Sequence, residues 1–264
     1  MFKDTNYCKA FIDTSRYVFK WLCKQPSVNE ESITNWLLYN LSEELPSLKY
    51  RQFTRHVEAK TTGADWEWWF VDNNYALCLR IQAKKIYDSK DNYDGIAYTN
   101  QYGLQIEKLI SDATLKNSIP FYSFYYAPQK NPKVLCGGQG WDKSDCGIFI
   151  SSATKLHTDF IKNGRKKVTA NDILIRSNPM HCLVCCMSAQ NVVDVYEHIR
   201  RYYQENLEIN SDNHKQGLHK DTPTYVKALL DSSDSEIPKW FEKEFDRQIK
   251  DINSIFVVDM RKQL

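Results

Sequence analysis

The chain has 264 residues, of which 42% are hydrophobic and 26% are charged. This balance is ample for a packed core and excludes a disordered chain, and the length suggests one large domain or one domain with an extension. No window approaches ~18 consecutive apolar residues, which excludes a membrane span. The first residues lack the apolar stretch of a signal peptide, so we expect a cytoplasmic protein with reduced cysteines. The net charge of +2 by itself neither favours nor excludes nucleic acid.

The N-terminal part of the sequence predicts two helices followed by strands. Residues 2–24 carry apolar side chains at helical spacing, and Pro26 ends that helix. Ser27 or Asn29 can cap a second helix at about residues 30–45. The spacing then changes to alternation, which predicts strands over residues 50–59, 65–71 and 75–84. Asp72-Asn73-Asn74 is a typical hairpin turn between the last two.

The order of the following elements predicts the fold class. Residues 101–117 return to helical spacing, and residues 120–127 form a buried strand. A hairpin and a crossover helix that leads to another strand predict an α/β three-layer core, in which helices flank a mixed central sheet. The second half predicts mainly helices, over residues 152–163, 169–175, 189–206, 223–231 and 238–252, with a last strand over residues 254–260. We expect a single domain over residues 1–264, with the core at about 27–130 and a mainly helical C-terminal extension at about 131–264 packed on it.

Three polar residues of the predicted hairpin form a chemically informative set. Asp65 opens the second strand, and Gln82 and Lys84 share one face of the third. Arg80 lies on the same face. Because the second strand starts where the third finishes, the hairpin brings Asp65 near residues 82–84. Asp and Gln supply hard oxygen ligands for Mg²⁺, the ion generates hydroxide from bound water, and a lysine stabilises the charge of the transition state.

The pattern of Asp65, Gln82 and Lys84 resembles the PD-(D/E)XK nuclease superfamily in its D…QxK variant, as in Mrr-like restriction nucleases and anti-phage effector nucleases. The element order over residues 27–127 also matches that superfamily's restriction-endonuclease-like core, so the resemblance covers about half of the chain. It implies a Mg²⁺- or Mn²⁺-dependent endonuclease that hydrolyses phosphodiester bonds of DNA. In the family, Asp65 corresponds to the motif aspartate, Gln82 to the residue that is usually Glu, and Lys84 to the motif lysine.

The resemblance also assigns supporting residues. Many members add a glutamate from the helix before the first strand, for which Glu31 is preferred here and Glu30 is the alternative. Gln105 and Tyr102 fit the place of a Gln and a Tyr on the following helix. A neutral Gln82 calls for another carboxylate ligand, for which Glu58 and Glu67 are candidates. The expected metal ligands are thus Asp65, Gln82 and Glu58, and the expected nucleic-acid contacts are Arg80, Lys85, Gln105 and Tyr102.

The family context also implies partners. DNA is the expected substrate, with RNA as an alternative, and a regulatory or sensor protein of a bacterial defence operon would restrain the nuclease. A homodimer is an open alternative, and no membrane partner is expected. The second class of function is a catalytically inactive module on the same fold that binds nucleic acid or a partner protein.

Several other patterns have two readings each. Trp66, Trp68 and Phe70 could stack on bases, although core packing is the more common role of aromatic residues in strands. Cys182 and Cys185 have the spacing of half a zinc site, but their run is apolar and favours core packing. A catalytic pair of Cys185 and a histidine has no local support. The basic runs 165–167 and 200–201 could contact phosphate or lie on solvated faces.

Overall fold

The computed structural model describes residues 5–53, 63–87, 93, 95–135, 142–185, 189–203, 215–232, 241, 243 and 252–261. The helices are α1 (Thr5–Lys24), α2 (Glu30–Glu44), α3 (Gln105–Leu115), α4 (Ala153–Leu156), α5 (Ala170–Leu174), α6 (Cys182–Cys185), α7 (Val192–Tyr203) and α8 (Thr224–Asp231). The strands are β1 (Leu48–Gln52), β2 (Trp66–Val71), β3 (Ala76–Lys85), β4 (Thr99–Asn100), β5 (Gly103–Leu104), β6 (Ile119–Tyr125), β7 (Ile148–Ser152), β8 (Ser177–Pro179), β9 (Leu218–His219) and β10 (Ser254–Asp259). Short 3₁₀ turns cover Gly95–Ala97 and Lys143–Asp145, and a π-helical turn over His157–Ile161 continues α4.

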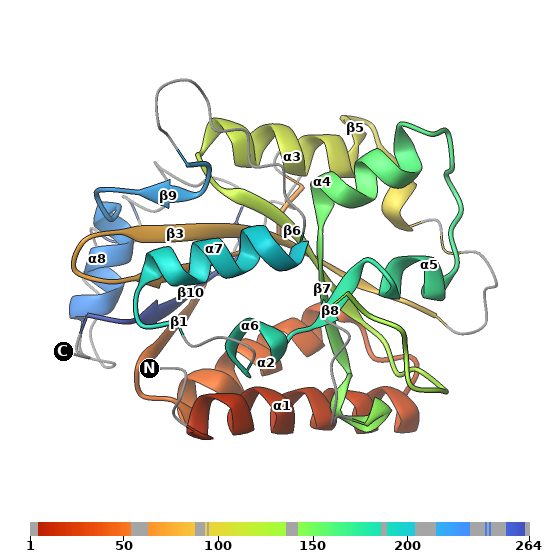
Figure 1. Cartoon of the computed structure of the whole chain (residues 1–264), viewed down its shortest axis with the longest axis horizontal. Helices are drawn as coiled ribbons and strands as arrows, with labels where there is room; N and C mark the ends of the chain where they lie inside the picture. The colour runs from red at the N-terminus through yellow and green to blue at the C-terminus, as the bar shows by residue number, and fades with distance from the viewer. Residues whose placement is uncertain are drawn as a thin grey trace.

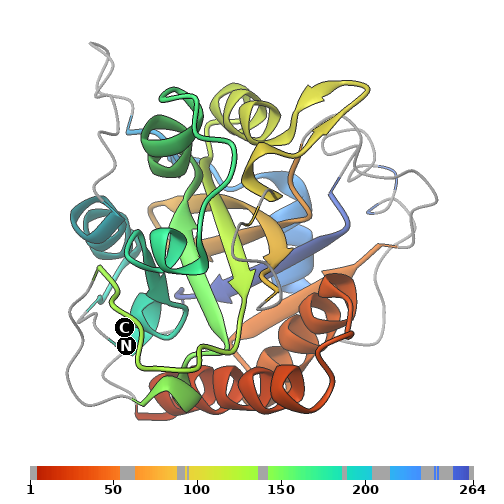
Figure 2. The same ribbon diagram turned by 90° about the vertical axis from the view of Figure 1, so that its right-hand side faces the viewer.

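A mixed sheet forms the middle layer of the protein. Its strands run in the order β1-β10-β2-β3-β6-β7-β8, and β9 pairs with the start of β3. The β2–β3 hairpin is antiparallel, and β6 lies parallel to β3 after the crossover through α3. Helices α1 and α2 lie on the opposite side of the sheet from α3 and α4 (Figures 1 and 2). The expected three-layer α/β core with flanking helices is confirmed.

The last strand occupies a position that the sequence does not reveal. β10 lies inside the sheet, parallel to β2 and antiparallel to β1. The first two strands of the chain are therefore not neighbours, because β10 separates them. The second half of the chain supplies most of the helices, as expected, and also completes the sheet. The register places Ser254 opposite Trp66, so the residue before β10 lies beside the residue before β2.

Two apolar cores cover the two faces of the sheet. Trp66, Trp68 and Phe70 point to the face under α1, α2, α6 and α7, where each is buried. Phe11 of α1 stacks on Trp68 with ring centroids 5.8 Å apart. Trp69 and Val71 point to the other face, under α3, α4 and α8. Since helices cover both faces, the aromatic residues of β2 are core residues, and the base-stacking reading of that strand does not hold.

The two cysteines of α6 are buried or disulfide-bonded. Cys182 is 3% exposed, and Cys185 forms a disulfide with Cys8 of α1. The expectation that this cysteine is reduced is therefore wrong: α1 and α6 pack so closely that the two Cα atoms are 4.8 Å apart, within the range that a disulfide needs. Within the described residues no group of three or more His, Cys, Asp or Glu side chains could hold a metal ion, so the zinc reading gains no support.

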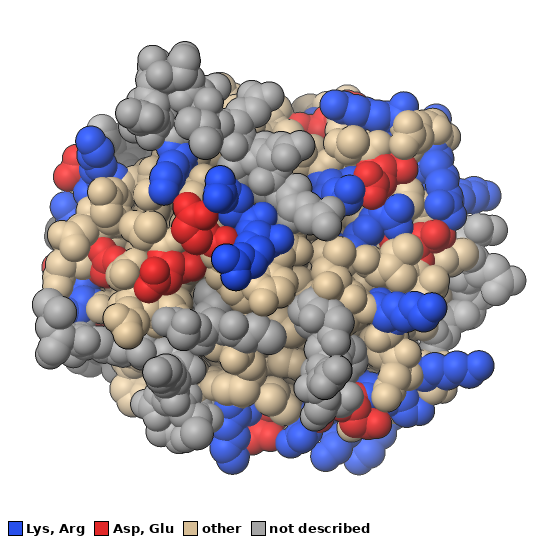
Figure 3. Space-filling model, viewed as in Figure 1, with Lys and Arg blue, Asp and Glu red and all other residues tan. Residues whose placement is uncertain are grey.

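On the face that Figure 3 shows, acidic and basic side chains intermingle. Arg200 and Lys215, for example, both pair with Glu197 of α7, at 3.0 and 3.4 Å. Arg165 likewise pairs with Asp172. These contacts favour a solvated role for the basic runs. No helix in the described part of the chain is long and apolar enough to cross a membrane.

Candidate functional site

Asp65 is held at the entrance of β2 by main-chain bonds on both sides. Its N–H donates to the carbonyl of Ile81 on β3 at 2.8 Å, and its carbonyl accepts from the N–H of Asn253, just before β10, at 2.9 Å. The side chain therefore starts from a backbone fixed by three strands. A site that must hold a ligand in one geometry needs such support.

The Asp65 carboxylate contacts the end of β3, as the hairpin predicts. Its Oδ2 accepts from Nε2 of Gln82 at 2.6 Å and from the N–H of Ala83 at 2.7 Å. The pKa of Asp65 is raised to about 7, chiefly by burial and also by the nearby charges of Glu30 and Glu31, whereas Lys84 and the N–H of Ala83 oppose the rise. Asp65 is thus a carboxylate whose charge the protein itself balances poorly.

Gln82 connects Asp65 to helix α3. Besides its bond to Asp65, Nε2 of Gln82 donates to the carbonyl of Ala83 at 3.0 Å. Its Oε1 accepts from Nε2 of Gln105 at 2.9 Å. Gln105 is the first residue of α3, so the start of this helix is tied to the hairpin. The structure therefore brings together Asp65, Gln82 and Gln105, which the sequence places 17 and 23 positions apart.

Lys84 lies at the same end of β3, between acidic groups. Its Nζ is 3.9 Å from Oε1 of Glu30, and its charge acts on Asp65. The cap of α2 explains why Glu30 is there: Asn29 accepts from the N–H of Ser32 at 2.7 Å and fixes the first turn of the helix. The other Glu30 oxygen accepts from the N–H of Lys85 at 3.0 Å. Glu30 therefore joins α2 to β3 and holds the lysine near Asp65.

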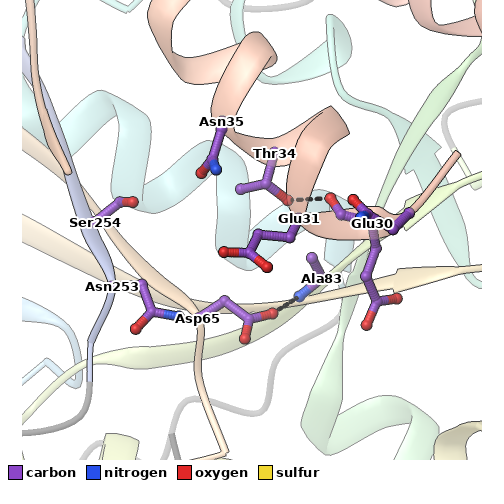
Figure 4. Close-up of a pocket in the computed structure, with 9 residues that line it drawn as sticks. Glu30, Glu31, Thr34, Asn35, Asp65, Ala83, Asn253 and Ser254 are labelled. Atoms are coloured by element: carbon purple, nitrogen blue, oxygen red, sulfur yellow. Dashed lines mark hydrogen bonds between the residues drawn. The ribbon is translucent and has the colours of Figure 1, made fainter. Parts of the chain in front are cut away.

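A cavity of about 300 Å³ opens beside Asp65. Its lining comes from α2 and its cap, from Asp65 and Ala83, and from the entrance of β10: Asn29, Glu30, Glu31, Thr34, Asn35, Asp65, Ala83, Asn253 and Ser254. The carboxylate of Glu31 points from α2 into the space beside Asp65 and Ala83, and the Asn253 amide lies on the other side of Asp65 (Figure 4). The cavity thus gathers carboxylate and amide oxygens around one buried acid.

A family model described as "Family of unknown function (DUF6615)" matches residues 7–261. The chain belongs to DUF6615. No curated protein matches it. The match spans every element of the site, from α2 to β10, so in this DUF6615 protein the site lies within the family's own sequence.

Two of the expected nucleic-acid contacts lie elsewhere. Arg80 is 1% exposed and pairs with Glu67 at 2.9 Å and with Asp112 of α3. Lys85 points to the opposite face of β3, where its Nζ donates to the carbonyl of Val28 at 2.6 Å and to that of Pro26. Both expectations are corrected, because alternation gives the face of a strand but not what covers it. Tyr102 is 49% exposed and Gln105 lies in the site.

Of the two further carboxylates considered as metal ligands, Glu67 and Glu58, the structure describes only the first. Glu67 is 2% exposed and accepts from Arg80, from Nε1 of Trp69 at 2.8 Å and from the Tyr225 hydroxyl at 2.8 Å. A buried carboxylate whose oxygens already accept three donor groups is a structural ion-pair partner. Glu67 is therefore not a metal ligand of this site. Glu58 lies outside the described residues.

Sequence reasoning missed the contributions of the α2 face and of the C-terminal strand. Asn253 lies 188 positions after Asp65 and precedes a run that reads as a buried strand. A polar residue just before such a run is a weak signal, and the partner strand could not be known. Thr34 and Asn35 follow Glu31 by one helical turn, so the choice of Glu31 could have drawn attention to them.

The donor set fits a hard divalent cation. Mg²⁺ is usually held by one or two carboxylates and keeps several waters. Asp65 and Glu31 are two carboxylates that line one cavity together with Asn253, and the Gln82 amide is hydrogen-bonded to Asp65. Burial raises the pKa of Asp65, so a cation in the cavity would stabilise its charged form. Within the described residues the carboxylates form no ready-made group of three, so waters would complete the coordination.

Proposed function

We propose that this DUF6615 protein is a metal-dependent endonuclease that hydrolyses phosphodiester bonds of DNA and acts as an effector in bacterial anti-phage defence. The observation that carries the proposal is the meeting of Asp65, Gln82 and Lys84 at one end of the β2–β3 hairpin, beside the cavity that Asp65 lines. The Asp65 carboxylate accepts a hydrogen bond from Gln82 at 2.6 Å. The resemblance to the D…QxK variant of the PD-(D/E)XK superfamily supports the reaction type, and the restraining partner is inferred from that family alone.

Each residue has a role in the proposed reaction. Asp65 and Glu31 would hold Mg²⁺ or Mn²⁺, with amide oxygens and water as further ligands. When bound, the ion supplies charge that stabilises the phosphate oxygens and lowers the pKa of a bound water. Lys84, held 3.9 Å from Glu30, orients the attacking water or stabilises the charge that develops on the phosphate. Gln105 fixes the amide of Gln82 and thereby the position of Asp65.

The test is incubation of plasmid and oligonucleotide DNA with the protein, with Mg²⁺, with Mn²⁺ or with EDTA. We expect cleavage with either metal, none with EDTA, and none by Asp65→Ala. Asp221→Ala serves as a control for loss of one negative charge, since Asp221 is exposed and follows β9, which pairs with the opposite end of β3 from Gln82. Cleavage by Asp65→Ala at the wild-type rate would contradict the assignment of the site.

The second candidate function is a binding module without hydrolysis. The observation that favours it is the orientation of Gln82, whose Nε2 faces Asp65 while its oxygen faces Gln105. In that arrangement the carboxylate receives neutral donors in place of a cation. DNA binding without cleavage under any metal condition would favour this candidate over the endonuclease.

A further inference from the structure

A small hairpin stands next to the site and joins the end of β3 to α3. Strands β4 and β5 pair through Thr99 with Leu104 and Asn100 with Gly103. Gly103 has a φ of +108°, which the turn requires and which favours glycine. The hairpin projects beyond the N-terminal end of α3 (Figure 2). It is thus an ordered, protruding arm.

The arm is tied to α3 by its own turn residue. Oδ1 of Asn100 accepts from the N–H of Tyr102 at 2.9 Å and from Nζ of Lys108 at 3.2 Å. Lys108 is one turn into α3, and its Nζ also lies 4.7 Å from the centroid of the Tyr102 ring. These contacts define the position of the Tyr102 ring relative to the helix.

The arm also presents Tyr98, which no sequence pattern singled out. Its carbonyl accepts from the N–H of Gln105 at 3.0 Å, so its backbone adjoins the residue that holds Gln82. The Lys84 Nζ lies 5.5 Å from the centroid of the Tyr98 ring. The ring therefore stands directly beside the lysine of the proposed active site.

Both rings are open to solvent. Tyr98 is 51% exposed and Tyr102 is 49% exposed. Each has a lysine ammonium group near its ring, Lys84 beside Tyr98 and Lys108 beside Tyr102. Exposed aromatic rings interleaved with positive charges are the combination by which proteins bind unpaired bases and their phosphates without reading sequence.

We infer that the β4–β5 arm binds single-stranded nucleic acid, with bases stacked on Tyr98 and Tyr102 and a backbone phosphate near Lys108, and so leads the strand to Lys84 of the proposed active site. In a duplex the faces of the bases are already stacked on one another, so rings of this kind gain from a strand that is unpaired. The inference rests on the proposed function in one respect: it makes unpaired strands the substrate class of the same site.

The experiment measures binding separately from cleavage. Fluorescence anisotropy in EDTA compares a labelled single-stranded oligonucleotide with its own blunt duplex, for the wild type and for the double variant Tyr98→Ala/Tyr102→Ala. We expect the wild type to bind the single strand more tightly, and we expect the double variant to weaken that binding about tenfold or more, the effect of losing a base–aromatic stack.

Two further variants make the result specific. Tyr98→Phe/Tyr102→Phe keeps the rings and should bind as the wild type does, because stacking needs the ring and not the hydroxyl. Tyr39→Ala removes a tyrosine that is 55% exposed on α2 and should change nothing. Single-strand binding by the double alanine variant equal to that of the wild type, or equal losses for Tyr39→Ala, would overturn the inference. If no DNA is cleaved with any metal, the nuclease proposal fails, and the anisotropy still decides the role of the arm.

Discussion

Replacement of Asp65 by asparagine should stabilise the metal-free protein at pH 8. The wild-type carboxylate is charged there, although burial raises its pKa to about 7 from an ordinary 3.8. Asparagine removes the charge and keeps the contacts, because its Oδ1 can accept from Gln82 and from the N–H of Ala83 as Oδ2 does now. The variant thus isolates the cost of a buried charge.

The magnitude follows from the pKa difference between the folded and the unfolded chain. A pKa rise of about three units corresponds to about 4 kcal/mol of unfolding free energy, and the partial exposure of Asp65 to the cavity reduces this to about 2 kcal/mol. The sign is fixed by the direction of the shift. Because the pKa of Asp65 is higher in the folded chain than in the unfolded chain, the stability that protonated Asp65 contributes is fully present below about pH 4. This stability is lost as the pH rises through about 7.

The assay is urea unfolding in EDTA at several pH values between 4 and 8, followed by tryptophan fluorescence. The difference in unfolding free energy between Asp65→Asn and the wild type should grow as the pH rises across this range. Taking the difference removes the effect of all other titrating groups, because both proteins share them. Asp221→Asn, a change to an exposed aspartate before α8, should show no such growth. Mg²⁺ at pH 8 should then stabilise the wild type and leave Asp65→Asn unchanged. A variant no more stable than the wild type at pH 8 would refute this account of Asp65.

Changes at three other residues test the hairpin around Asp65. Lys84→Met should slow cleavage by about 10²–10³-fold and change DNA affinity far less, as expected of a charge that acts on the transition state; equal losses would make Lys84 a phosphate clamp. Glu67→Ala should lower the unfolding free energy by about 3–5 kcal/mol, because it leaves Arg80 buried with one partner fewer, and urea unfolding measures the loss. In a Mg²⁺ titration of cleavage, Gln82→Glu should retain activity and Gln82→Leu should lose it; wild-type titration by Gln82→Leu would exclude Gln82 as a ligand.

The sequence predicted the parts of the site that depend on local geometry. Alternation in residues 65–71 and 75–84 predicts a hairpin, and the direction of the hairpin brings Asp65 to Gln82, as the structure has it. The cap of α2 at Asn29 was one of two alternatives in the sequence, and it positions Glu30 and Glu31. These features need no knowledge of distant segments.

Features that depend on distant segments could not be predicted. Nothing in the run over residues 254–260 says that it inserts between the first two strands, because a fully buried strand fits any central position of a sheet. The cavity wall at Asn253 and Ser254 therefore remained unknown. Likewise, Arg80 and Gln82 share a face of β3, but Asp112 of α3 forms an ion pair with Arg80. This contact makes Arg80 a structural residue, and the sequence does not reveal it.

The bonds of Gln82 offer a physical reason for glutamine at this position. A glutamate in its place would set a second carboxylate about 3 Å from that of Asp65 in a site where burial already raises the pKa to about 7. Two such acids would share a proton in the absence of a cation and would bind a cation more tightly. Glutamine supplies a donor to Asp65 without metal, and a rotation of its amide would offer an oxygen when a cation balances the charge. Gln82→Glu should therefore make stability depend more strongly on Mg²⁺ than it does in the wild type, and thermal unfolding with and without Mg²⁺ measures that difference. An equal Mg²⁺ effect in both proteins would mean that Gln82 is a hydrogen-bond bridge between Asp65 and Gln105 and takes no part in binding the cation.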